Sequence, residues 1–184
     1  MSLHAPLERR KLHTRTITIE GYARSDGLWD IEAQMTDVKT YGFDNHDRGR
    51  IDAGEPLHDM RLRLTVDAEL CIHAIEATTT AGPYRACPAV TPNYGRLKGM
   101  VIGPGWRRRI REALGGPEGC THLNELLPAM ATVAIQTLWA ERERRRQGGR
   151  STTRGRPAEI DSCYALKSDG EVVGRYWPEF STRP

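Results

Sequence analysis

The nine residues from His58 to Val66, HDMRLRLTV, give the clearest structural signal in the sequence. Side chains along this stretch alternate in polarity. One face carries His58 and then an apolar residue at every second position (Met60, Leu62, Leu64 and Val66), whereas the other face is polar (Asp59, Arg61, Arg63 and Thr65). Alternation with a period of two predicts a β-strand that has one buried face and one exposed face.

Further strands and helices are predicted on both sides of this strand. Residues 14–21 and 29–35 also alternate, and the turn-forming residues 24–27 between them predict a hairpin, while residues 70–80 predict another strand. Helical periodicity predicts a short helix at residues 104–114 and a long one from 123 to about 146, in which Pro128 implies a start near Asn124 or a kink. Strands followed by helices predict an α+β fold, in which an antiparallel sheet packs against two or more helices.

These elements divide the chain into three predicted parts. Residues 14–140 form a single α+β domain, within which residues 40–56 are a long loop because they are rich in Gly and Asp and poor in apolar residues. Residues 141–158 form an Arg-rich linker. Residues 159–180 are predicted to be a C-terminal hairpin packed on the same domain, because apolar residues flank a turn at residues 168–170.

Composition limits the classes of protein to be considered. The chain has 184 residues, of which 38% are hydrophobic, enough for one domain with a core. The longest charge-free apolar stretch, residues 126–140, is shorter than the roughly 20 residues that span a bilayer. The N-terminus lacks the apolar region of a secretory signal. We therefore expect a cytoplasmic protein with no membrane partner.

Charge and motifs argue against several further functions. Residues 141–156 carry seven Arg and two Glu, and the net charge of the whole chain is only +3. The domain itself is therefore not expected to bind nucleic acid, although a nucleic-acid-associated module using residues 142–156 remains a third alternative. The sequence contains no GxGxxG, phosphate-loop, HExxH or GxSxG motif, so nucleotide-driven and serine-hydrolase chemistry lack support.

The cysteines and histidines are the candidates for a chemical site. Cys87 lies in a predicted loop, Cys120 immediately precedes the long helix, and His122 follows two residues later. The positive end of a helix dipole favours a thiolate at Cys120, the form that binds metals and attacks electrophiles. His58 interrupts an otherwise apolar strand face. A metal site, a metal-free thiol site and inert buried cysteines all remain open on these residues alone.

Four phrases of the sequence resemble a bacterial family of unknown function, whose members share no assigned reaction. The phrases are Arg24-Ser-Asp-Gly-Leu-Trp-Asp-Ile31, Gly54-Glu-Pro-Leu-His-Asp-Met60, Gly105-Trp-Arg-Arg-Arg109 and Gly119-Cys-Thr-His-Leu123. The order of His58, a strand, Cys87, a short helix and Cys120 before a long helix is also similar to the iron–sulfur scaffold fold. Proteins of that fold hold zinc or a nascent cluster.

The scaffold resemblance implies a set of metal ligands. It places His58 at the scaffold's Asp position and Cys87 and Cys120 at two of its Cys positions, while Pro56 replaces the remaining Cys, which argues against cluster assembly. One zinc or iron ion is then expected on His58, Cys87 and Cys120, with His122 as a further ligand. Three protein ligands leave a coordination position open for catalysis, and four would make a closed structural site.

We therefore expect a small metal-dependent enzyme of the lyase or hydrolase type, acting on a small organic substrate with an aromatic or carboxylate group. Asp59 and Tyr94 are candidates for acid–base catalysis, and Arg61 and Arg107 for binding the substrate. The alternative is a non-enzymatic metal or iron–sulfur carrier. A homo-oligomer is not excluded by the sequence.

Overall fold

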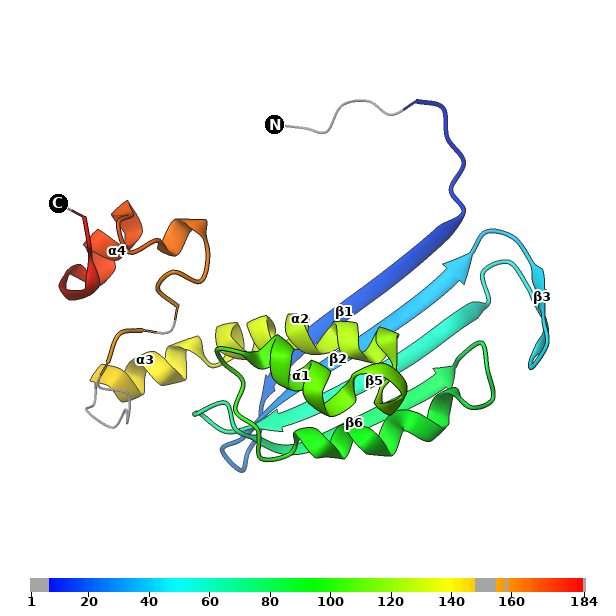
Figure 1. The fold of residues 1–184 in the computed structure, drawn as a ribbon, viewed down its shortest axis with the longest axis horizontal. Helices are drawn as coiled ribbons and strands as arrows, with labels where there is room; N and C mark the ends of the chain where they lie inside the picture. The colour runs from blue at the N-terminus through cyan, green and yellow to red at the C-terminus, as the bar shows by residue number, and fades with distance from the viewer. Residues whose placement is uncertain (1–6, 148–154, 158, 184) are drawn as a thin grey trace. The chain divides into compact units, whose positions relative to one another are not determined.

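The computed structural model describes residues 7–147, 155–157 and 159–183 and divides the chain into two units, residues 1–139 and 140–184. The first unit contains an antiparallel sheet of β1 (His13–Ala23), β2 (Trp29–Lys39), β5 (Pro56–Val66) and β6 (Ile72–Ala81), in that order. Each strand pairs with the strand before it in this order, so the sheet is a meander (Figure 1). The predicted α+β fold with an antiparallel sheet is confirmed.

A small hairpin lies within the segment predicted to be a loop. β3 (Phe43–Asn45) and β4 (Gly49–Ile51), which follow β2 and precede β5 in the chain, form a separate two-stranded sheet. Ile51 is buried, and Arg48 ties the hairpin to β5 by donating hydrogen bonds to the carbonyl oxygen of Pro56 and to Glu55. The segment is therefore more ordered than its composition indicates.

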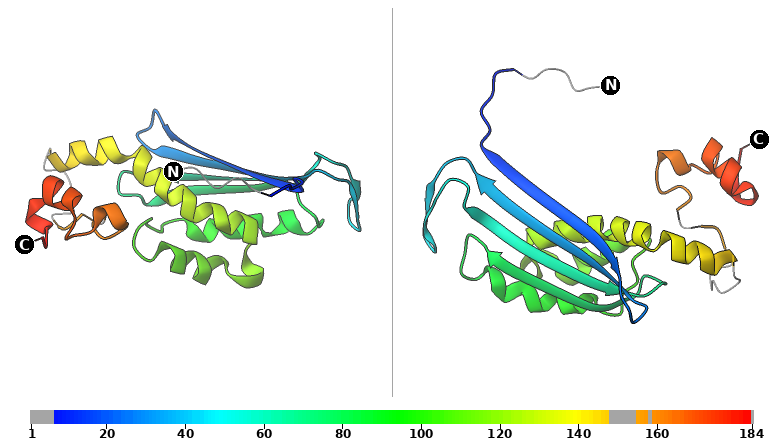
Figure 2. Two further views of the ribbon diagram at one scale, coloured as in Figure 1. Left: turned by 90° about the horizontal axis from the view of Figure 1, so that it is seen from above. Right: turned by 180° about the vertical axis from the view of Figure 1, so that it is seen from behind.

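Within the first unit, helices cover one face of the four-stranded sheet and leave the other uncovered (Figure 2). They are the 3-10 helix η1 (Cys87–Leu97), α1 (Trp106–Leu114), the short η2 (Gly116–Glu118) and α2 (Thr121–Thr137). α3 (Trp139–Gln147) comes next in the chain and belongs almost entirely to the second unit. α2 packs across β1, β2 and β5, whereas η1 packs beside β6. At Gly21 of β1, a Cβ would collide with Thr137, so the missing side chain allows α2 to approach the sheet closely.

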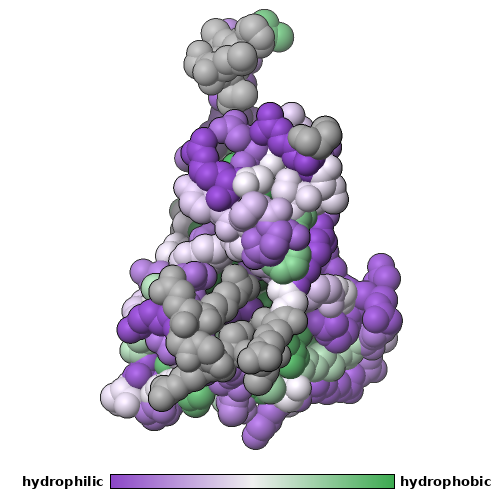
Figure 3. All heavy atoms as spheres, turned by 90° about the vertical axis from the view of Figure 1, so that its left-hand side faces the viewer, coloured by the Kyte–Doolittle hydropathy of each residue, from purple (hydrophilic) through white to green (hydrophobic). Residues whose placement is uncertain are grey.

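The core lies between the sheet and these helices. The side chains predicted to share the apolar face of β5 are all buried, and they meet alternate residues of β2 together with one face each of α1 and α2 (Ile31, Ala33, Met35, Ile110, Leu114, Leu123, Leu126, Leu127 and Met130). None of the helices in the described ranges is long and apolar enough to cross a membrane. The coloured residues on the face drawn in Figure 3 are mostly hydrophilic.

The prediction of one helix from residue 123 to about 146 is wrong in part, because the structure has two helices there, whereas the Arg-rich linker predicted at residues 141–158 stays a prediction. α2 begins at Thr121 and keeps Pro128 within it, and a break at Leu138 separates it from α3. α3 extends into the predicted linker because Glu141 pairs with Arg144 and Arg145 one turn later, which stabilises an exposed helix. Residues 148–154 and 158 of the predicted linker lie outside the described residues.

The predicted C-terminal hairpin is also wrong. Residues 164–166 form the 3-10 helix η3, α4 spans Glu171–Tyr176, and η4 spans Pro178–Phe180. Only Val173 of α4 is fully buried, and Glu171 pairs with Arg175 at helical spacing. A short apolar run cannot distinguish helix from strand by periodicity alone, and here the i,i+4 ion pair accompanies the helix. The packing of this region on the first unit stays a prediction.

Candidate functional site

A row of polar side chains crosses the covered face of the sheet at one end. Arg15 of β1 pairs with Asp37 of β2, and Asp37 pairs with His58 of β5, so the three residues lie side by side on adjacent strands. The next row along the same face is apolar and contains Met35 and Met60. We call Arg15, Asp37, His58 and two residues from the start of α2, Cys120 and His122, the His58 cluster.

Asp37 is the acceptor on which this row depends. Only 1% of its surface is exposed. Arg15 donates through Nε to Oδ1 at 2.9 Å and through Nη2 to Oδ2 at 2.8 Å, and His13 Nε2 lies 2.8 Å from Oδ1. Burial alone would raise the pKa of Asp37, but the hydrogen bonds from Arg15 and His13 outweigh burial and hold that pKa well below its usual range. Asp37 is therefore a buried carboxylate anion.

His58 uses one of its ring nitrogens and leaves the other free. Its Nδ1 lies 2.9 Å from Asp37 Oδ2, whereas its Nε2 is buried and has no hydrogen-bond partner in the described part of the chain. Burial, reinforced by the neighbouring His122, lowers the pKa of His58, so the ring is neutral at neutral pH. The anionic Asp37 accepts the Nδ1 proton, which places the lone pair on the buried Nε2.

The start of α2 brings a second imidazole beside the His58 ring and a sulfur atom beside that imidazole. The rings of His58 and His122 have centroids 3.9 Å apart, and burial also lowers the pKa of His122. Cys120 is the N-cap residue of α2, and its Sγ lies 3.9 Å from His122 Nδ1 and 4.0 Å from Met60 Sδ. Two neutral imidazoles and a thiol therefore converge at the positive end of a helix.

The chemistry of these atoms suits a transition metal. Donor atoms of Asp37, His58 and His122 lie within 4.8 Å of one another. Asp37 already accepts hydrogen bonds on both oxygens, which is the arrangement of a carboxylate that orients a metal-bound histidine from behind. Cys120 lies outside this group, but its Sγ is 3.9 Å from His122 Nδ1. His58 Nε2, His122 and Cys120 Sγ are nitrogen and sulfur donors of the kinds that zinc, iron and copper accept.

A family model described as "Protein of unknown function (DUF2889)" matches residues 13–136. The chain belongs to the DUF2889 family. The matched region runs from β1 through almost all of α2 and contains every residue of the His58 cluster. No curated protein and no solved structure gives a significant match to the chain. The predicted family is thus confirmed, and the resemblance to the iron–sulfur scaffold stays a prediction.

Within the DUF2889 domain, two of the four predicted ligands, His58 and His122, share a group of converging donors. Cys120 lies outside that group, although its sulfur is 3.9 Å from His122 Nδ1. Cys87 begins η1 and packs so close to Gly82 that a Cβ there would lie 3.1 Å from its sulfur. Like Cys120, it is absent from the groups of converging donors among the described residues, and unlike Cys120 it has no contact with His122 among the hydrogen bonds of those residues. The interval between β6 and Cys87 is only a few residues long, and this keeps Cys87 beside the end of β6.

The two residues predicted for acid–base catalysis occupy different places. Asp59 lies on the uncovered face of β5, opposite to His58, and accepts a hydrogen bond from Gln34 at 3.0 Å. Tyr94 is buried beside the start of α2, where it donates to Asn124 Oδ1 at 2.7 Å and accepts from the backbone N–H of Cys120 at 3.1 Å. Burial raises the pKa of Tyr94. Its hydroxyl therefore fixes the helix start that presents Cys120.

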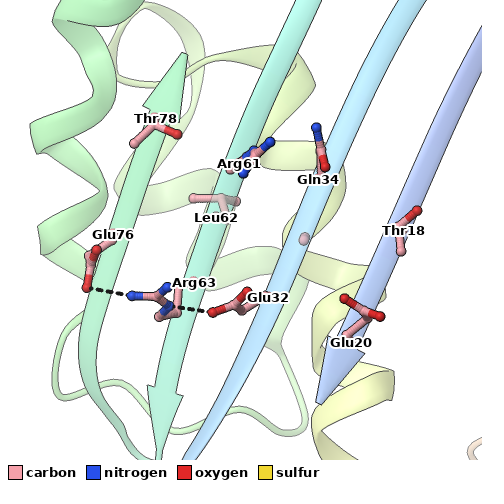
Figure 4. A pocket seen from close by; sticks show the side chains of 10 residues that line it. Thr18, Glu20, Glu32, Gln34, Arg61, Leu62, Arg63, Glu76 and Thr78 are labelled. Carbon is pink, nitrogen blue, oxygen red and sulfur yellow. Dashed lines mark hydrogen bonds and ion pairs between the residues drawn. The ribbon is translucent and has the colours of Figure 1, made fainter. Parts of the chain in front are cut away.

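The two predicted substrate-binding arginines lie in separate grooves. Arg61 lies beside Gln34 on the uncovered sheet face, in a groove where Arg63 pairs with acidic side chains on both neighbouring strands (Figure 4). Arg107 is exposed on α1 and lines a groove between α1 and α2. Glu125 also lines that second groove and pairs with Arg15 at 2.9 Å. Only the groove of Arg107 thus adjoins the His58 cluster.

Sequence reasoning did not identify Asp37, Arg15 or His13. Asp37 continues the buried alternation of Ile31, Ala33 and Met35, and a carboxylate at the end of an apolar face is the signal that could have identified it. A second group of converging donors, Asp67, Cys71 and His73, is more exposed. There Asp67 accepts two backbone N–H groups of its own turn, which accounts for its position.

Proposed function

We propose that this DUF2889 chain is a small metal-dependent enzyme that holds one zinc or iron ion on His58, His122 and Cys120. The ion would serve in lyase or hydrolase chemistry on a small organic substrate. The observation that carries the proposal is the buried Nε2 of His58, which has no partner among the described residues. A buried polar atom without a partner costs stability, and a bound metal ion would remove that cost.

The surroundings of His58 support a metal rather than a simple core histidine. A core histidine would satisfy both ring nitrogens, whereas here Asp37 binds Nδ1 and Nε2 has no partner among the described residues. The ring of His122 lies 3.9 Å from the His58 ring, and Cys120 Sγ lies 3.9 Å from His122 Nδ1. Three protein ligands leave one coordination position of a tetrahedral ion open. An ion in that state polarises a carbonyl group or activates a water molecule, which is the chemistry that lyases and hydrolases need.

The groove between α1 and α2 supports a substrate that carries a carboxylate. Arg107 and Arg111 line the groove, and Glu125 connects it to Arg15 of the His58 cluster. Guanidinium groups bind carboxylates through paired hydrogen bonds. We therefore propose Arg107, rather than Arg61, as the residue that orients the substrate.

Metal content of the purified protein tests the proposal. The native chain and the variants His58→Gln and His73→Gln would be purified without chelator and compared by elemental analysis. His73 is a matched control because its Nε2 lies 2.8 Å from Asp67, much as His58 Nδ1 lies 2.9 Å from Asp37. We expect about one ion per chain in the native protein and in His73→Gln, and little in His58→Gln. Full occupancy in His58→Gln would exclude the site.

A second candidate function, a metal carrier, is favoured by the exposure of the ligands. Cys120 and His122 are only partly buried, at the beginning of α2, so an ion bound there can be reached from solvent. A carrier should give up its ion to a competing acceptor within minutes and remain folded, whereas an enzyme should retain it. The rate of zinc transfer to a colorimetric chelator distinguishes the two functions.

A further inference from the structure

Met60 places a second sulfur atom next to the proposed metal ligands. It follows His58 by two residues on β5, so both side chains point to the covered face of the sheet. Only 1% of Met60 is exposed. Its Sδ lies 4.0 Å from Cys120 Sγ, which in turn lies 3.9 Å from His122 Nδ1. Met60 therefore adds a second sulfur donor beside the Cys120 sulfur, which contacts His122.

The separations between these donors are close to those around a bound ion. Metal–sulfur bonds of about 2.3 Å and metal–nitrogen bonds of about 2.0 Å place two sulfur ligands of a tetrahedral ion about 3.8 Å apart, and a sulfur and a nitrogen about 3.5 Å apart. The two separations in the structure, 4.0 Å and 3.9 Å, exceed these values only slightly. Each of these two contacts is therefore compatible with a pair of atoms that share one ion after small rotations of the side chains.

We propose that Met60 is a metal-selectivity residue, which makes the His58 cluster a high-affinity site for copper(I). This proposal rests on the proposed function, because it uses the same His58, His122 and Cys120 ligands. A thioether is a soft ligand that binds copper(I) well, whereas zinc and ferrous ions take thiolate, imidazole and oxygen ligands in preference. Zinc or iron would thus leave the fourth position open for substrate, and copper(I) would close it with Met60.

Copper(I) binding needs no electron transfer. The copper enters as a monovalent ion, the Cys120 thiol releases its proton to solvent, and the resulting thiolate, two neutral imidazoles and the thioether surround the ion. The charges of ion and thiolate cancel, which lowers the cost of holding the ion beside the buried His58 and Met60 side chains. Copper(I) in this closed arrangement would inhibit the metal-dependent reaction by occupying the position that the substrate needs.

The competing explanation is that Met60 only fills the core, and Met35 provides the control for it. Met35 pairs with Met60 across β2 and β5, points to the same face and is fully buried. Leucine has nearly the same volume as methionine, so Met60→Leu and Met35→Leu should both fold, with losses of stability below about 1.5 kcal/mol. Only Met60→Leu removes a sulfur atom beside Cys120.

The experiment measures copper(I) and zinc affinity in the native chain, Met60→Leu, Met35→Leu and His58→Gln. Copper(I) is titrated without oxygen against the chromophoric chelator bicinchoninate, and zinc against a zinc-specific dye. We expect Met60→Leu to weaken copper(I) binding about tenfold or more and to leave zinc binding within about twofold, because zinc makes no use of the thioether. Met35→Leu should change neither affinity.

X-ray absorption at the copper edge provides a second readout. The native protein should show two sulfur and two nitrogen neighbours around copper, and Met60→Leu should show one sulfur fewer. Unchanged copper(I) affinity in Met60→Leu, or equal losses in Met60→Leu and Met35→Leu, would overturn the role of Met60 while zinc binding upheld the proposed function. Failure of the native chain to bind either metal, or full binding by His58→Gln, would overturn both.

Discussion

Replacing Asp37 by asparagine should damage both the stability of the first unit and its affinity for metal. Asp37 accepts two hydrogen bonds from Arg15, and it contacts His13 Nε2 and His58 Nδ1, all at 2.8–2.9 Å. An asparagine of the same shape has one acceptor oxygen and no charge, and its NH₂ group faces donors. At least two of the four contacts must then be lost or become repulsive.

The size of the effect follows from these contacts. A hydrogen bond to a charged group contributes about 1.5–3 kcal/mol, so two lost bonds give about 3–6 kcal/mol. Arg15 is partly exposed and keeps its ion pair with Glu125, so solvent and Glu125 compensate for part of the lost charge. We therefore expect Asp37→Asn to lower the free energy of unfolding by about 3 kcal/mol, near the lower end for a broken buried pair.

The effect on metal affinity has a separate cause. Without the Asp37 anion, the proton of the His58 ring is no longer held on Nδ1, and the lone pair is no longer fixed on Nε2. Loss of such an outer hydrogen bond typically weakens metal binding about 10–100-fold. Zinc titration of the folded variant would measure this change independently of stability.

Urea denaturation of the metal-free protein, followed by tryptophan fluorescence, measures the change in stability. Glu32→Gln is the matched control, because Glu32 pairs with Arg63 at 2.7 Å on the exposed face of the same sheet. An exposed pair of this kind contributes about 1 kcal/mol or less. The reasoning is refuted if Asp37→Asn destabilises no more than Glu32→Gln and also binds zinc with native affinity.

Three further predictions concern the same region. In protein treated with a chelator, the free energy of unfolding should fall as the pH decreases from 7 to 5. Both His58 and His122 have lowered pKa values in the folded chain, so the unfolded chain takes up protons first, and the slope is up to about 1.4 kcal/mol per pH unit for each proton. A free energy of unfolding that does not change with pH in urea denaturation would contradict this. Tyr94→Phe should lower the free energy of unfolding, measured by urea denaturation, by about 1–2 kcal/mol, because the hydroxyl holds the start of α2. The variant should keep its normal metal content, and loss of metal would show that the hydroxyl acts at the metal site. Cys120→Ser should lose metal and Cys87→Ser should keep it, and elemental analysis giving the reverse would restore Cys87 as a ligand.

Periodicity predicted the sheet well and the C-terminal unit poorly. The sequence alternation within β5 extends over the nine residues from His58 to Val66, and its buried face is as the sequence indicates. At residues 164–180 the apolar runs are too short to determine a period, and the chain forms short helices there instead of strands. The break between α2 and α3 at Leu138 could not be predicted either, because the residues on both sides are compatible with one continuous helix.

Part of the candidate site could be predicted, because two of its residues stand out from the local sequence pattern. His58 was conspicuous because it interrupts an apolar face, and Cys120 because it precedes a helix. Cys87 was selected through a resemblance and not through a pattern, and the structure leaves it out of the cluster. The role of Tyr94 depends on Asn124, which is thirty residues away in sequence, and such a contact cannot be read from local spacing.

The position of the polar row also bears on whether the cluster contributes to stability or to function. Replacing a buried network of charges by apolar side chains of similar size is often neutral or stabilising, so the fold does not require Arg15, Asp37 and His58 in this row. The adjoining Met35–Met60 row shows that the same sheet and helix accept an apolar pair there. A network present for stability alone would also satisfy its buried atoms, yet His58 Nε2 has no partner in the described part of the chain. The His58 ring lies 3.9 Å from the ring of His122, and the sulfur of Cys120 lies 3.9 Å from His122 Nδ1. The proposed metal ion would therefore account for the unsatisfied atom, whereas packing alone does not.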